Sequence, residues 1–235
     1  MADLTPNVDL VRSLGRLARG LSALFWALPL TLIVSVQTIR SATFESLGTL
    51  AFVPACVSFL VLFHGLSEMS FFQAQERIWI ASLERARLVS LACAGLSPFL
   101  VWERKLPGIP MFMAMVIVML ILGLILLYCL NIVIRRLTAM LPDETLRDEA
   151  RFFSLLNCGL LGALPLVLVI FATLSRMDRL PILMIHLLSY LNDISHYIIL
   201  MMLLAPLAMT MTMAWKIKEA VLESVFQSPP ANPAK

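Results

Sequence analysis

Long apolar runs separated by short charged segments form the main pattern of this chain. The clearest run is residues 110–134, PMFMAMVIVMLILGLILLYCLNIVI, which contains no charged residue and is followed by Arg135 and Arg136. A helix rises about 1.5 Å per residue, so a run of this length can cross a hydrocarbon core of roughly 30 Å. The run therefore predicts a membrane-spanning helix.

Five further segments show the same pattern, and together they predict an all-α, polytopic transmembrane helix bundle of about six spans. The predicted spans are residues 21–38, 47–66, 88–102, 110–134, 152–174 and 194–214. The third is short for a crossing, and a re-entrant segment is the alternative there. Residues 181–191 are apolar but short, and Asn192 and Asp193 interrupt them. We expect this segment to lead into the last span along the membrane interface.

The polar segments between the spans predict amphipathic helices. In residues 1–20, Arg12, Arg16 and Arg19 lie opposite the valine and leucine side chains, as in a helix on the membrane surface. Residues 67–87 and 135–151 predict two cytoplasmic helices beside a transmembrane bundle that extends over residues 21–226, and the tail 227–235 has a disordered composition. Within residues 135–151, Pro142 is expected to end one helix and Asp143 to be the N-cap of the next. The first apolar run is longer than the apolar core of a signal peptide, so we expect this span to be retained and not cleaved off.

A weak internal repeat accompanies these segments. The pattern Arg-x-x-Ser occurs at Arg19, Arg87 and Arg151, each time before an apolar run that contains a proline. The repeat would make the bundle three quasi-repeated helical hairpins, each with a cytoplasmic amphipathic helix. Interfacial arginine and span proline are both common in membrane proteins, so chance recurrence is the alternative.

The distribution of basic residues predicts the orientation. With six spans and a cytoplasmic N-terminus, the inner segments hold thirteen lysines and arginines and the outer segments hold five. Basic residues accumulate on the cytoplasmic side of membrane proteins. We therefore expect a bacterial-type cytoplasmic (inner) membrane, both termini in the cytoplasm, and a third segment that crosses.

Composition supports the membrane class. Hydrophobic residues make up 60% of the chain and charged residues 14%, with a mean hydropathy of +0.90. Globular domains have about 45–50% apolar and about 25% charged residues. The net charge of +3 is too small to indicate a nucleic-acid partner. The four cysteines fall inside apolar runs, which favours packing roles over disulfides.

The strongest candidate for chemistry is a metal site at His186, Asp193 and His196. In a continuous helix these residues share a face, and imidazole and carboxylate groups are ordinary ligands for zinc and similar metals. The alternative is a polar cluster at the interface, with Tyr190 and Tyr197 as aromatic anchors.

Other chemistry has less support. The central parts of the spans lack Asp, Glu, Lys, Arg and His, the groups that proton and ion pathways use. His64 lies at the opposite end of the bundle from His186 and His196, which disfavours a bis-histidine haem, so no cofactor is expected. Asn131 and Asn157 are candidates for hydrogen bonds between helices.

The sequence therefore favours a non-enzymatic integral membrane protein. Its expected role is that of a scaffold or accessory subunit that docks partner proteins or lipids through its cytoplasmic amphipathic helices. The expected partners are membrane lipid, other membrane or cytoplasmic proteins, or a second copy of the chain. The alternative is a transporter or channel for a small or apolar solute, with Pro29, Pro98, Pro165 and Pro206 bending the spans around a cavity. A membrane enzyme using the two histidines and Asp193 is a third hypothesis.

Overall fold

The computed structural model describes the backbone of residues 8–40, 42–73, 75–141, 143–174 and 182–226. Side chains are described for most of these residues. The exceptions are residues 8–11, 42, 43, 45, 168, 171, 172, 174, 182–199 and 224–226.

The described chain folds into helices. They are α1 (Val8–Arg40), the short 3-10 segment η1 (Ala42–Leu50), α2 (Val53–Met69), α3 (Arg77–Lys105), α4 (Pro110–Met140), α5 (Glu144–Leu174) and α6 (Ile182–Phe226). No strand occurs in the described ranges, and six helical segments there are long and apolar enough to cross a membrane. The predicted all-α bundle is confirmed, and the chain is an integral membrane protein.

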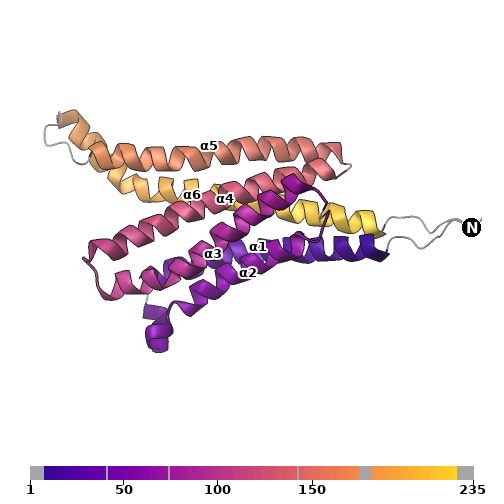
Figure 1. Ribbon diagram of the computed structural model, residues 1–235. Coiled ribbons are helices and arrows are strands. Elements are labelled where there is room, and N and C mark those ends of the chain that lie inside the picture. Colours follow the sequence, from indigo (N-terminus) through magenta and orange to yellow (C-terminus); the bar gives the residue numbers. More distant parts are fainter. Residues whose placement is uncertain (1–7, 41, 74, 142, 175–181, 227–235) are drawn as a thin grey trace, which may run out of the picture.

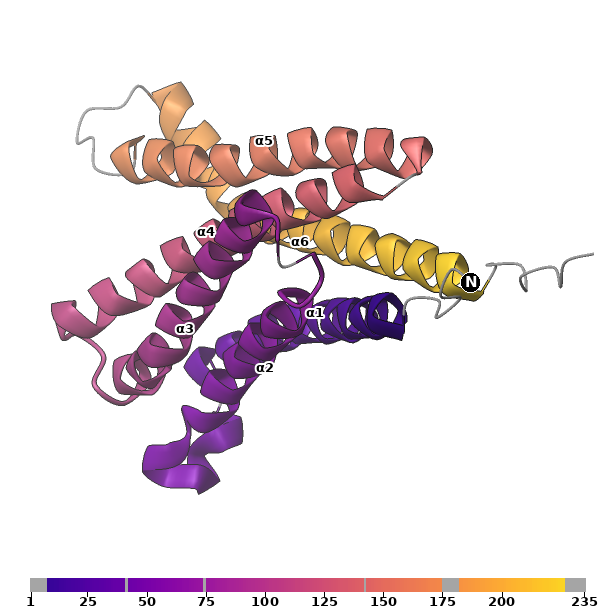
Figure 2. The same cartoon turned by 45° about the vertical axis from the view of Figure 1, so that its right-hand side comes forward.

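Consecutive helices pair with one another as antiparallel neighbours. The closest pairs are α1 with α2 and α3 with α4, and α6 closes the bundle by packing against both α5 and α1. The helices run side by side, and the start of α1 and the end of α6 lie at the same end of the bundle (Figures 1 and 2). We call this the basic end, because its described residues include Arg12, Arg16, Arg19, Arg77, Arg85, Arg87, Arg135, Arg136, Arg147, Arg151, Lys216 and Lys218.

The helices are longer than the predicted spans. Helix α1 has 33 residues, or about 50 Å, and it continues from residue 8 into the apolar span without a break. Residues 8–20, which were expected to form a separate surface helix, therefore belong to the same helix as the apolar span. Continuing the helix gives the first amides of the apolar span backbone partners within the chain, so these residues extend the bundle beyond its apolar part.

Residues 67–87 do not form the single helix that was predicted. Helix α2 ends at Met69, a turn follows, and α3 begins at Arg77. The turn is held by Trp79, whose buried indole N–H donates a hydrogen bond to the backbone oxygen of Phe72 at 2.9 Å. Burial of this large aromatic side chain against the core outweighs the helical preference of the intervening residues.

Residues 135–151 are divided between two helices, as predicted. Helix α4 ends at Met140 and α5 begins at Glu144, and the predicted N-cap Asp143 is confirmed. Its Oδ1 accepts hydrogen bonds from the backbone nitrogens of Thr145 (2.9 Å) and Leu146 (3.2 Å). The Thr145 hydroxyl, followed by the Leu146 amide, lowers the pKa of the Asp143 carboxyl. The cap is therefore strongest with the carboxylate ionised and weakens as pH falls through this lowered pKa.

The two weakest predicted spans lie within long helices. Residues 88–102 belong to the continuous 29-residue α3, which is long enough to cross and does not have the broken form of a re-entrant segment. Helix α6 runs from Ile182 through Asn192 and Asp193, so the predicted interruption there is wrong. Asparagine and aspartate lower helix propensity by less than about 1 kcal/mol, too little to break a long apolar helix.

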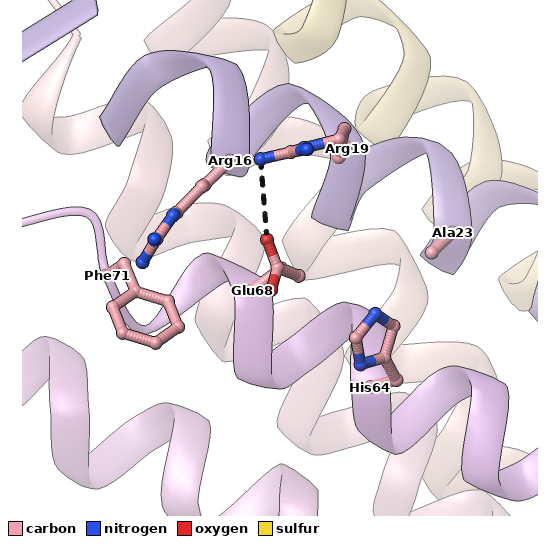
Figure 3. A pocket seen from close by; sticks show the side chains of 6 residues that line it. All are labelled: Arg16, Arg19, Ala23, His64, Glu68 and Phe71. Carbon is pink, nitrogen blue, oxygen red and sulfur yellow. Dashed lines mark ion pairs between the residues drawn. The ribbon is translucent and has the colours of Figure 1, made fainter. Parts of the chain in front are cut away.

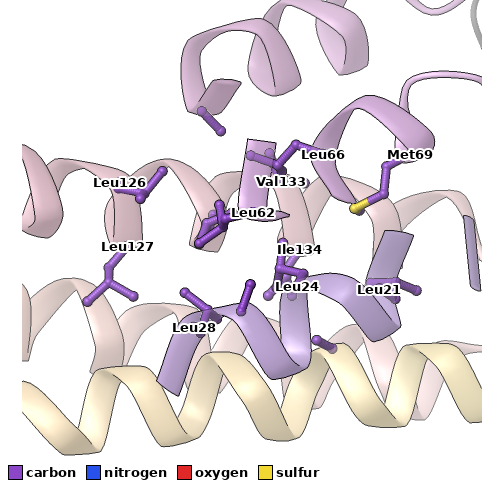
Figure 4. Close-up of a cluster of buried hydrophobic side chains, with 14 of the residues drawn as sticks. Leu21, Leu24, Leu28, Leu62, Leu66, Met69, Leu126, Leu127, Val133 and Ile134 are labelled. Carbon is purple, nitrogen blue, oxygen red and sulfur yellow. The ribbon is translucent and has the colours of Figure 1, made fainter. Parts of the chain in front are cut away.

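Apolar side chains form both the core and the outer surface of the bundle. Leucines from α1, α2 and α4 interlock in the centre, among them Leu24, Leu62 and Leu126 (Figure 4). Large apolar side chains also project outward, such as Val169 at 60% exposure and Met201 at 70%. An apolar outer surface of this extent is stable in lipid and not in water.

Two glycines, Gly20 and Gly65, form a close backbone contact between α1 and α2. A Cβ atom added at Gly20 would lie 2.7 Å from the backbone oxygen of Gly65 and 2.6 Å from Cγ of Met69. A Cβ atom at Gly65 would lie 3.0 Å from Cβ of Ala23. Small residues therefore let the two backbones approach, which increases van der Waals contact where lipid supplies no hydrophobic driving force.

We expect Gly20→Ala to lower the free energy of unfolding by about 1–3 kcal/mol, because the new methyl group would force α1 and α2 apart. Unfolding in mixed detergent micelles measures the change. The matched control is Gly15→Ala on the same helix, where an added Cβ meets nothing within 4 Å. This control should be neutral or stabilising by up to about 1 kcal/mol. Equal losses in both variants would contradict the close contact.

Candidate functional site

A polar cavity opens at the basic end between α1 and α2. It has a volume of about 340 Å³ and is lined by Arg16, Arg19 and Ala23 from α1, by His64 and Glu68 from α2, and by Phe71 from the turn that follows. We call it the basic cavity. Figure 3 shows the charged side chains of the two helices approaching each other across it.

The contacts inside the basic cavity are weak and leave its cations accessible. The Arg19 guanidinium lies 3.9 Å from the Glu68 carboxylate, and the Arg19 side chain is 72% exposed. The Arg16 guanidinium lies over the Phe71 ring, 4.2 Å from its centroid. An exposed ion pair of this length contributes at most about 1 kcal/mol. With two arginines and one glutamate, the lining of the cavity has an excess of basic side chains.

Helix periodicity positions these residues. Arg16, Arg19 and Ala23 are spaced three and four residues apart, so they share one face of α1. His64 and Glu68 are four residues apart on α2, and the contact between Gly20 and Gly65 brings these faces together. Sequence reasoning did not find this site, because its two halves lie in different segments and only the glycine contact joins them.

A second polar group lies buried between α4, α5 and α6, and we call it the polar seam. The side-chain nitrogen of Asn131 donates to the backbone oxygen of Ser154 (3.1 Å) and to Sγ of Cys158 (3.2 Å). The side-chain nitrogen of Asn157 donates to the Thr210 hydroxyl at 3.1 Å. The predicted hydrogen bonds of both asparagines between helices are confirmed. Amide and hydroxyl groups do not ionise, so these bonds join the helices without offering a proton path.

A third feature is an apolar cavity of about 280 Å³ between α1, α4 and α6. Its polar lining is limited to Thr31 and Ser35, and the Thr31 hydroxyl already donates to the backbone oxygen of Leu28 at 2.8 Å. Among the residues whose side chains are described, none is a hydrogen-bond partner of the Ser35 hydroxyl. The remaining lining consists of Leu, Val, Ile, Met and Phe side chains and Gly123, so this cavity suits an apolar group and not an ion.

The predicted metal residues are not tested. The side chains of His186, Asp193 and His196 lie outside the described part of the structure. Within the part that is described, no group of three or more His, Cys, Asp or Glu side chains is arranged to hold a metal ion. The four cysteines are free, as expected from their positions in apolar runs.

Comparisons with known proteins give no match: no protein-family model, curated protein or solved structure corresponds to this chain.

The polar seam can be tested by a double-mutant cycle of Asn157→Ala and Thr210→Val. We expect a coupling free energy of about 0.6 kcal/mol, and no more than about 1.7 kcal/mol, because interhelical hydrogen bonds in membranes have modest net strength. Unfolding of the four proteins in mixed micelles measures the coupling.

The control cycle replaces Thr210→Val with Thr212→Val. The exposed Thr212 hydroxyl donates to the backbone oxygen of Ala208 within α6. No coupling with Asn157 is expected there. Zero coupling in the first cycle, or equal coupling in both, would contradict the hydrogen bond between α5 and α6.

Proposed function

We propose that this protein is a non-enzymatic membrane scaffold or accessory subunit that docks partner proteins or lipids through its basic end. We further propose that the basic end faces the cytoplasm of a bacterial-type inner membrane, with both termini on that side, because lysine and arginine accumulate there. The observation that carries the proposal is the extension of α1, α3, α4, α5 and α6 past their apolar parts into charged, exposed helix ends.

The charges at the basic end support docking because they are only weakly engaged. The Lys216 ammonium pairs with the Glu149 carboxylate at 2.5 Å, and both side chains are more than 40% exposed. Arg151 and Asp148 pair at 3.6 Å and are still more exposed. Exposed pairs contribute at most about 1 kcal/mol, so a partner can replace them at little cost.

An aromatic group lies beside these charges. The Trp215 side chain is 39% exposed, its Nε1–H donates to the Glu219 carboxylate at 2.7 Å, and the Lys218 ammonium lies 4.2 Å from its ring centroid. Tryptophan is enriched both at binding hot spots and at membrane interfaces. Such a group supports contact with either a protein or the headgroup region of a membrane.

The interior supports a passive role. The central parts of the predicted spans carry no acidic, basic or histidine residue, and the polar seam uses its asparagines for contacts between helices. Ionisable residues within membranes normally mark proton or ion pathways. A bundle without them is well suited to hold other proteins in place.

Docking is tested by reversing exposed charges at the basic end with Arg77→Glu and Arg135→Glu. We expect proteins that co-purify with the chain from native membranes in mild detergent to decrease severalfold, because each lost charge contact weakens binding by up to about 1 kcal/mol. Quantitative mass spectrometry measures the decrease.

The matched control reverses two charges at the opposite end, with Arg40→Glu and Lys105→Glu, and should leave the co-purifying proteins unchanged. A C-terminal reporter checks that each variant keeps its orientation. Recovery of the lone chain from wild-type membranes would exclude the docking of partner proteins.

The second candidate function is transport of an apolar solute, and the apolar cavity favours it. Gly123 lines that cavity, and a Cβ atom added there meets nothing within 4 Å. We expect Gly123→Leu to fill the cavity and to slow the flux of an apolar fluorescent solute in reconstituted vesicles by about tenfold or more. Gly162→Leu is the control, because Gly162 is equally open and lies outside the cavity. Equal flux in vesicles with and without the protein would exclude this function.

A further inference from the structure

We propose that the basic cavity binds the phosphate group of an anionic phospholipid, whose acyl chains lie along the exposed apolar faces of α1 and α2. The inference rests on the lipid-docking part of the proposed function and names the lipid class and the site.

The basic cavity lies at the depth of a lipid headgroup. Its lining extends along α1 from Arg16 to Ala23, about 10 Å, and the apolar run of this helix begins at Leu21. On α2 the lining extends from His64 into the turn that follows the helix. The cavity therefore spans the change from apolar to polar sequence on both helices, where the phosphates of a bilayer lie.

The donors in the cavity match a phosphate group. The guanidinium groups of Arg16 and Arg19 present planar sets of N–H donors that bind phosphate oxygens in pairs. The exposed imidazole of His64 supplies a further nitrogen at the same cavity. At 3.9 Å the contact between Arg19 and Glu68 is too long for a hydrogen bond, so the Arg19 donors remain available to a phosphate.

A continuous apolar surface leads away from the cavity on the same faces of both helices. On α1, Trp26 lies three residues after Ala23 and is 68% exposed. Leu30 lies four residues after Trp26 and is 46% exposed. On α2, Val61 and Val57 precede His64 by three and seven residues, with exposures of 39% and 49%. These spacings keep side chains on one helix face, so the surface continues from the cavity into the apolar part of the bundle.

This combination favours a phospholipid over a free phosphate ion. An anion needs only the basic donors, whereas a phospholipid also uses the exposed apolar surface beneath them. Basic pockets between membrane helices on the cytoplasmic side are typical sites for anionic headgroups.

The experiment measures lipid binding to the purified full-length chain in detergent by native mass spectrometry, with phosphatidylglycerol and phosphatidylcholine as probes. We expect one phosphatidylglycerol to bind about tenfold or more tightly than phosphatidylcholine, because each arginine near the headgroup adds roughly a fivefold preference for an anionic lipid. The double variant Arg16→Gln with Arg19→Gln should lose this preference.

The matched control is Arg77→Gln with Arg135→Gln, which removes the same charge from exposed positions of the basic end outside the cavity. It should keep the preference for phosphatidylglycerol. Arg16→Lys with Arg19→Lys keeps the charge but loses the paired donors, so it should bind more weakly than the wild-type chain. Thermal unfolding of each variant without added lipid shows whether it has folded.

Three results would overturn the proposal. They are equal binding of the two lipids by the wild-type chain, an equal loss of preference in the cavity and control variants, and displacement of phosphatidylglycerol by inorganic phosphate at equal concentration. The lipid experiment uses the purified chain without partner proteins. A failure to bind lipid there would leave the docking of partner proteins intact, because docking is tested separately by the Arg77→Glu and Arg135→Glu variants. The two proposals therefore fail in distinguishable ways.

Discussion

The absence of water in a hydrocarbon core is the constraint on which this structure depends. Each backbone N–H and C=O group in lipid must find a partner within the chain, and a helix provides that partner at every turn. The described chain meets this demand with long helices whose apolar side chains face both the core and the lipid. Packing between the helices then depends on close approach and on a few hydrogen bonds, since lipid is as apolar as leucine.

Close backbone contacts and hydrogen bonds between helices join different pairs of helices. Helices α1 and α2 approach through Gly20 and Gly65, where side-chain atoms are nearly absent. Helices α4, α5 and α6 are joined instead by the amides of Asn131 and Asn157. The side-chain nitrogens of these two asparagines thus join helices in the interior, and the charged groups are concentrated where the helices leave the apolar region.

The sequence predicted the features that depend on local composition. Apolar run length located the spans, and Asp143 was identified as an N-cap because its side chain acts on the amides that follow it. Helix ends set by distant packing were not predictable in this way. The turn before α3 depends on burial of Trp79 against other helices, and no local pattern within residues 67–87 encodes that burial. The basic cavity was missed for the same reason, because Arg19 and Glu68 are neighbours only after α1 and α2 have packed.

The contact between the first and last helices affects the order of assembly. The Phe25 ring of α1 lies 5.2 Å from the Trp215 ring of α6, centroid to centroid, and the two helices pack against each other. A ribosome synthesises α6 only after α1 to α5. The face of α1 that meets α6 therefore has no helix partner there until α6 enters the membrane, and this side of the bundle closes only at that point.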